Sequence, residues 1–145
     1  MGNTQPLRKV SFEDIKQAIQ HPDKYFIINT LKPGEQDCLI PHTIPCTEEE
    51  RRINKCLDNK QNSLPIIIYG RNNNDDTIVK RYHQLSTLGF SNVYLYSGGM
   101  FEWLLLQDIY GADNFPTTRK HLDILAFRPP SALLQKPMIA YGDID

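Results

Sequence analysis

One stretch of the sequence, Leu64 to Trp103, most limits what this chain can fold into. It opens with LPIIIY, a β-branched run apolar on both alternating faces, as expected of a strand at the centre of a parallel sheet. A helix is then predicted from about Asp76 to Leu88, ending at Gly89, by apolar residues at helical spacing: Ile78, Val79, Tyr82 and Leu85. SNVYLY predicts the next strand. Strand, helix and strand at this spacing indicate a βαβ unit in an α/β fold with a mostly parallel central sheet.

The loop after the first of these strands is the candidate functional site. In open α/β sheets, ligand-binding and active sites lie at the carboxyl ends of the parallel strands. The loop consists of Gly70, Arg71, Asn72, Asn73, Asn74, Asp75 and Asp76. One arginine against two aspartates gives it a formal net charge of −1.

The run IIIYG…LGFSNVYLYSGGMFEW resembles the carboxyl-terminal half of a rhodanese-like domain. In that family a strand ends in Tyr-Cys, and an anion-binding loop, a helix, a Gly-Phe pair, a strand and a Gly-Gly-x-x-x-Trp turn follow. The matching residues here are Phe90, Val93, Leu95, Gly98, Gly99 and Trp103. The resemblance covers most of the first 115 residues and implies a three-layer fold, a mostly parallel sheet flanked by helices.

The catalytic signature of that family, roughly Cys-x-x-Gly-x-Arg-Ser after the tyrosine, is absent. Gly70 stands at the persulfide-carrying cysteine, Asn73 at the glycine, Asp75 at the arginine and Asp76 at the serine. Sulfur transfer, like the phosphatase chemistry of relatives of this fold, needs a thiolate and donors that hold an anion. Glycine has no nucleophile, and two carboxylates repel an anionic substrate. The resemblance therefore implies a non-catalytic domain with a binding or scaffolding role and no cofactor.

Two interpretations of the polar loop remain open. In the first, Asn74, Asp75 or Asp76 caps the following helix and fills the former anion site, since a carboxylate at a helix N-terminus stabilises it by about 0.3–1 kcal/mol. In the second, the loop binds a protein partner or a cation. It does not have the alternating acidic ligands, central glycine and distant glutamate of a calcium loop.

The competing class of function is an enzyme, a sulfurtransferase or phosphatase-like protein that uses a displaced cysteine. The chain has three cysteines, an odd number with no C-x-x-C pair, which predicts reduced thiols: Cys38, Cys46 and Cys56. Either Cys38 or Cys46 would serve if the fold brought it to the Gly70 loop. Cys38, His42 and Cys46 recur every four residues, but two prolines interrupt any helix that would align them, so no metal site is predicted.

The segment Met100–Tyr110 is apolar around more than one face of its predicted helix. One sheet surface cannot cover both faces, so we expect either the rest of the chain or a partner to cover the other. The candidate interface residues are Phe101, Trp103, Leu104, Leu105 and Phe127. A protein partner or self-association, including a homodimer, is predicted on this basis.

We predict a leader at residues 1–8, a rhodanese-like domain at 9–112 and a C-terminal extension at 113–145 that packs on the domain or on a partner subunit. Lys and Arg total 16 against 17 Asp and Glu, so no basic footprint for nucleic acid is present. No run approaches the roughly 18 apolar residues of a membrane span, and no signal peptide opens the chain, so we expect a cytoplasmic protein. FEWLLLQDIYG and FPTT also resemble rhodanese-like proteins of large DNA viruses, which implies host cytoplasm or virion.

Two helix starts are predicted from capping patterns. Ser11 with Asp14 resembles a capping box, and Thr47 with Glu50 fits one fully. Both precede segments with apolar residues on one helical face, so each predicts a helix packed on the sheet.

Overall fold

Helices and strands alternate along the chain. The structure, a computed structural model, describes residues 7–134. The elements are α1 (Phe12–Gln20), β1 (Phe26–Asn29), the 3-10 helix η1 (Pro33–Glu35), α2 (Glu49–Asp58), β2 (Ile66–Tyr69), α3 (Thr77–Leu88), β3 (Val93–Tyr96), α4 (Gly99–Tyr110) and the 3-10 helix η2 (Ile124–Phe127).

The three strands form one parallel sheet in the order β1-β2-β3. Ile67 in the middle strand lies opposite Ile27 on one side and Tyr94 on the other. Single bridges extend both edges, Lys9 to Leu95 and Thr43 to Ile27. All four residues of β2 are buried, which confirms the prediction of a central strand covered on both faces.

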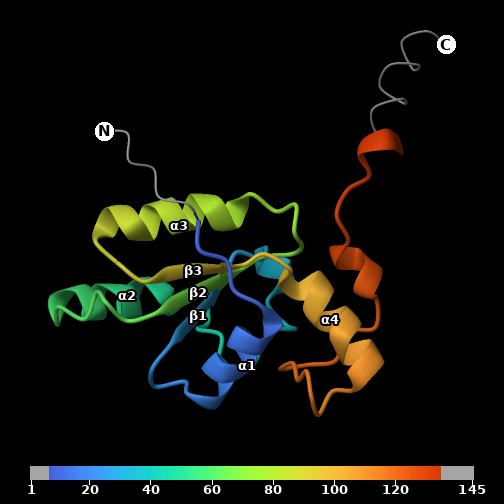
Figure 1. Cartoon of the computed structure of the whole chain (residues 1–145), viewed down its shortest axis with the longest axis horizontal. Helices are drawn as coiled ribbons and strands as arrows, with labels where there is room; N and C mark the ends of the chain where they lie inside the picture. The colour runs from blue at the N-terminus through green and yellow to red at the C-terminus, as the bar shows by residue number, and fades with distance from the viewer. Residues whose placement is uncertain (1–6, 135–145) are drawn as a thin grey trace, which may run out of the picture.

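Alternate side chains of the strands enter two separate hydrophobic cores. Ile27, Ile67 and Tyr69 pack with residues of α1 and α4. Ile66 and Ile68, from the other face, pack with residues of α2 and α3. Figure 1 shows the sheet between α3 on one side and α1 on the other. The predicted three-layer α/β fold is therefore confirmed.

Capping explains where α1 begins, whereas the second predicted capping box is wrong. Ser11 Oγ accepts from the Glu13 N–H at 3.2 Å, and the Asp14 carboxylate accepts from the Ser11 N–H at 2.9 Å. The second helix begins at Glu49 instead, with no side-chain cap. Its start is displaced because the Glu48 N–H donates to the Pro45 carbonyl at 2.8 Å and closes a turn first.

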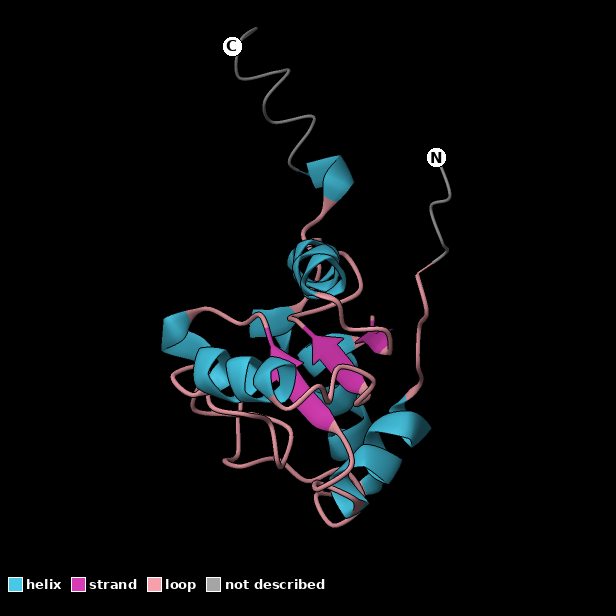
Figure 2. Ribbon diagram, turned by 90° about the vertical axis from the view of Figure 1, so that its left-hand side faces the viewer, coloured by secondary structure: helices cyan, strands magenta, loops and turns pink. Residues whose placement is uncertain are grey.

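The segment after α4 folds back along the outer side of that helix (Figure 1), and Figure 2 shows the strands of the sheet with helices around them. Trp103 Nε1 donates to the Pro116 carbonyl at 2.8 Å, and the ring centroids of Trp103 and Phe115 lie 5.1 Å apart. Phe115 and Phe127 are buried in the same core as α1 and α4. Within the described residues, the extension therefore shares the core of the domain. Residues 1–6 of the predicted leader and 135–145 of the predicted extension lie outside the described residues.

We predict that Phe115→Ala destabilises the protein by about 3–5 kcal/mol, because it removes a ring that packs on Trp103 inside the core. Leu122→Ala is the control in the same extension; its side chain is 86% exposed, and its loss should cost less than about 0.5 kcal/mol. Urea unfolding followed by tryptophan fluorescence measures both. Equal midpoints for the two variants would contradict the assignment of Phe115 to the core.

Candidate functional site

The candidate site lies at the carboxyl ends of the three strands. β1 runs into Thr30, β2 into Gly70 and β3 into the turn that starts α4. The Thr30 N–H donates to the Tyr69 carbonyl at 3.0 Å. The first N–H groups of α4 donate to loop carbonyls, Met100 N–H to Gly70 at 3.0 Å and Phe101 N–H to Arg71 at 2.8 Å. The anion-binding end of this helix is thus occupied by the loop itself.

The close approach of α4 to the loop depends on Gly99. Its φ is +65°, in the left-handed region that favours glycine. A Cβ atom at this position would lie 2.7 Å from the Gly70 carbonyl oxygen and 3.0 Å from the Asn72 nitrogen. Both neighbours are backbone atoms and have little freedom to move. Any other residue here would push the helix away from the loop.

The space beside Gly70 is filled by the carboxylate of Asp75. A Cβ atom built on Gly70 would lie 2.5 Å from Asp75 Oδ2 and 2.9 Å from Thr30 Oγ1. Asp75 Oδ2 accepts from the Arg71 N–H at 3.0 Å, and Oδ1 accepts from the Thr77 N–H at 3.0 Å and the Thr77 hydroxyl at 2.5 Å. One carboxylate therefore takes donors from the loop and from the first turn of α3 together.

This geometry favours the first interpretation of the loop and selects Asp75 among the three candidates. Asp76 occupies the N-cap position of α3 but makes no side-chain hydrogen bond to the helix. Asn73, Asn74 and Asp76 are not buried, whereas Asn72 is. Asp75 stands at the position where the family resemblance places an arginine, so the sign of the charge at that position is reversed.

Arg71 and Asn72 hold the C-terminal extension. Arg71 pairs with the Glu35 carboxylate, donates to the Ala126 carbonyl and lies over the Phe127 ring at 5.1 Å from the centroid. Asn72 is buried and donates from Nδ2 to the Phe127 carbonyl at 2.9 Å. No local pattern in the sequence predicts these partners, because they lie so far apart along the chain.

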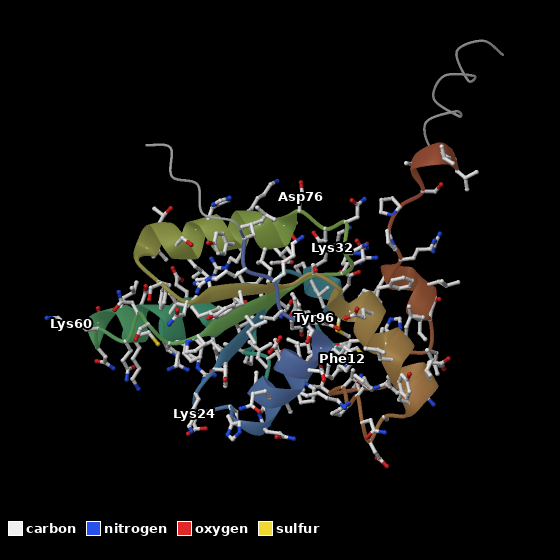
Figure 3. The ribbon with its side chains drawn as sticks, in the orientation of Figure 1. Phe12, Lys24, Lys32, Lys60, Asp76 and Tyr96 are labelled. Atoms are coloured by element: carbon white, nitrogen blue, oxygen red, sulfur yellow. The ribbon has the colours of Figure 1, made fainter. Side chains whose placement is uncertain are left out.

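A groove of about 770 Å³ lies between the loop and residues 126–134 of the extension. Asn74, Asp75 and Asp76 line one wall, and residues 128–131 line the other. Lys32 contributes a positive charge at this edge, on the same side of the molecule as Asp76 (Figure 3). The groove therefore carries charges of both signs.

The structure places the three cysteines in different settings. Cys38 is buried and donates from Sγ to the Arg119 carbonyl at 3.1 Å, and Cys56 lies in the opposite core. Burial raises the pKa of the Cys38 thiol despite a hydrogen bond with Thr117, and burial also raises the pKa of Cys56. A raised pKa disfavours the reactive thiolate. Cys46 is exposed. The three atoms nearest to a Cβ at Gly70 belong to Asp75 and Thr30, and none is a sulfur.

The candidate interface residues differ in their burial within the chain, and their role in an interface stays a prediction. Trp103, Leu104 and Phe127 are almost wholly inaccessible within the chain, because Phe115, Pro116 and η2 cover the second face of α4. Phe101 is half-buried. Leu105 is 39% exposed, and it is joined on the outer surface of α4 by the more exposed Ile109 and Tyr110. Among the apolar residues of α4, these outer ones are the most accessible.

Two further observations concern partners. Among residues 7–134, no three His, Cys, Asp or Glu side chains are grouped closely enough to hold a metal ion. None of the helices in that part of the chain has the length and apolar character to cross a membrane. The predictions of no cofactor and no nucleic-acid partner stay predictions.

Comparison with known proteins decides the family. The family model described as the rhodanese-like domain matches residues 11–106. The chain belongs to the rhodanese-like domain family. No curated protein matches the sequence significantly.

Solved structures share the rhodanese-like fold at low sequence identity. A protein of Bacillus halodurans has a TM-score of 0.57 at 18% identity, over 91% of this chain and 89% of that one. A single-domain sulfurtransferase of Saccharomyces cerevisiae has a TM-score of 0.53 at 22% identity, over 79% of this chain and 99% of that one. An Anabaena protein has a TM-score of 0.52 at 15% identity and covers 94% of each chain. The likeness concerns the fold alone, and the resemblance to viral proteins stays a prediction.

We predict that Asp75→Ala destabilises this rhodanese-like domain by about 1–3 kcal/mol, because it leaves the Arg71 and Thr77 N–H groups without their acceptor. Asp76→Ala removes the same charge one residue away, where no side-chain hydrogen bond to the helix exists, and should change stability by less than about 0.5 kcal/mol. Chemical denaturation at neutral pH compares the pair. Equal losses for the two variants would show that charge, and not hydrogen bonding, matters here.

We also predict that Gly99→Ala costs more than Gly89→Ala. Both positions have positive φ, so an alanine at either one costs about 1–2 kcal/mol in backbone strain. Only Gly99 adds a collision with backbone atoms, worth about 1–3 kcal/mol, since the nearest atom to a Cβ at Gly89 is an ordinary 3.8 Å away. Thermal unfolding of the two variants measures the difference. Equal melting temperatures would mean that the contact between α4 and the loop is not tight.

Proposed function

We propose that this rhodanese-like protein does not transfer sulfur and that it acts by binding another protein. The observation that carries the proposal is the carboxylate of Asp75 in the space that a side chain at position 70 would need. A persulfide mechanism requires a thiol at the base of the loop, in reach of donors that stabilise negative charge. Here Gly70 has only a hydrogen atom at the position of the thiol-bearing side chain, and the Asp75 carboxylate places a negative charge beside it.

The donors that would bind an anionic substrate already have partners within the chain. Asp75 accepts from the Arg71 and Thr77 N–H groups. The Arg71 guanidinium is paired with Glu35 and bonded to the Ala126 carbonyl. Thiosulfate or a phosphate group would have to displace these internal acceptors and would meet two carboxylates on entering. The loop is suited to hold its own shape, and it is poorly suited to turn over an anion.

The alternative, an enzyme with a displaced cysteine, finds less support. Cys38 and Cys56 are buried and their pKa values are raised, so neither forms a thiolate readily at neutral pH. Cys46 is exposed, but its side chain has no described contact with the loop. Three free thiols suit a reducing compartment, and we propose a cytoplasmic location for that reason.

We predict that the purified protein converts thiosulfate and cyanide to thiocyanate no faster than the uncatalysed background. The reason is that the position at the base of the loop has no nucleophile. Colorimetric detection of thiocyanate measures the rate, and the sulfurtransferase of Saccharomyces cerevisiae with the same fold provides a positive control.

Turnover above background that disappears on replacement of one cysteine would contradict this proposal. Cys38→Ser, Cys46→Ser and Cys56→Ser are the variants to compare, because these are all the cysteines in the chain. A rate that survives all three replacements points instead to a contaminating enzyme.

A further inference from the structure

The loop and the extension meet through a type of contact that is typical of peptide recognition. Arg71 and Asn72 bind two successive backbone carbonyls, those of Ala126 and Phe127. The Phe127 ring is 2% exposed and lies under the Arg71 guanidinium. Backbone hydrogen bonds and one buried aromatic anchor are the usual sources of affinity when a protein binds a short segment of another chain. Apart from the Phe127 ring, these contacts are to backbone atoms, so they depend little on the other side chains of η2.

The bound segment has a hollow on each of its two sides. α4 and residues 112–124 enclose a hollow of about 500 Å³ on one side, and the groove of about 770 Å³ lies on the other. η2 has four residues and no side-chain cap, and Leu125 within it is 57% exposed. In Figure 1 the segment lies outermost, beyond α4. A segment this short and this exposed opens more easily than the core does.

One polar atom is left unsatisfied when the segment is bound. Nδ1 of His121 is buried and has no hydrogen-bond partner among the described residues. The His121 ring lies against Phe127, with centroids 5.1 Å apart. An unpaired buried polar group is unfavourable, and release of the segment would expose this nitrogen to water. The closed state is therefore stabilised by the buried Phe127 ring and two hydrogen bonds, and it is destabilised at His121.

We propose that residues 121–128, called the strap from here on, cover a peptide-binding surface formed by Arg71, Asn72 and the adjoining face of α4. The ligand is a short segment of another protein that carries an aromatic side chain in place of Phe127 and offers two backbone carbonyls to Arg71 and Asn72. This inference rests on the proposed binding function and names its surface and its partner class. The strap competes with the partner, so binding requires the strap to leave.

The test adds the strap sequence to the full-length protein as a separate molecule. A fluorescent peptide with the sequence of residues 120–131, KHLDILAFRPPS, is titrated with the full chain, and its polarisation is recorded. The Phe127→Ala chain, whose own strap has lost its anchor, should bind the peptide at least about tenfold more tightly than the unchanged chain. Leu88→Ala, an exposed site on α3, is the control and should bind like the unchanged chain. A peptide with Ala at the Phe127 position should not bind.

Equal affinity of the unchanged and Phe127→Ala chains, or undiminished binding of the Ala peptide, would overturn the proposal. Should Phe127→Ala not fold, hydrogen exchange on the unchanged chain decides. Saturating peptide should accelerate exchange of the Ala126 and Arg128 N–H groups, which close η2 through Asp123 and Leu125, and leave β2 unaffected. No acceleration would overturn the proposal. Thiocyanate formation would reject the non-catalytic function separately, whatever the peptide does.

Discussion

The hydrogen bonds to the Asp75 carboxylate determine the shape of the loop on which the site depends. Backbone N–H groups that converge at the end of a strand and the start of a helix need an acceptor, and leaving them unpaired costs about 1–3 kcal/mol each. Asp75 supplies that acceptor from within the loop, to Arg71 on one side and Thr77 on the other. The loop therefore keeps its conformation without any bound anion. Gly99 adds a second constraint, since its missing Cβ allows α4 to donate to the same loop.

How far the sequence predicts this structure depends on the range of each interaction. Local patterns were enough for the sheet, because β2 is a β-branched run and Gly89 ends α3 in the left-handed conformation. They also placed Ser11 at the start of α1. The Thr47 pattern was misleading because the turn closed by the Pro45 carbonyl comes first. The sequence alone also shows that Gly70 stands where the family resemblance implies a cysteine. The partners of Arg71 and Asn72 lie 55 residues away in the extension, and no periodicity connects them.

The second face of α4 is another case in which local sequence patterns do not predict the contacting residues. Its sequence required a cover, since one sheet surface cannot bury an all-round apolar helix. It did not say whether that cover is another molecule or the chain itself. For one part of the helix the chain itself is the cover, because Phe115 packs on Trp103. The family model matches residues 11–106, so the residues that cover this face lie outside that match. Leu105 and Ile109 stay on the surface because the extension passes along the other side.

These contacts show that a thiol could not be placed at position 70 by one substitution alone. A side chain at position 70 meets the Asp75 carboxylate, so a new thiol would need that carboxylate to move. Moving it leaves the Arg71 and Thr77 N–H groups without their acceptor. Arg71 is also unable to bind a substrate anion while it holds Glu35 and the Ala126 carbonyl. Catalysis would therefore require coordinated changes in the loop, in η1 and in the extension. That mutual dependence is the physical argument for the binding role proposed for this site.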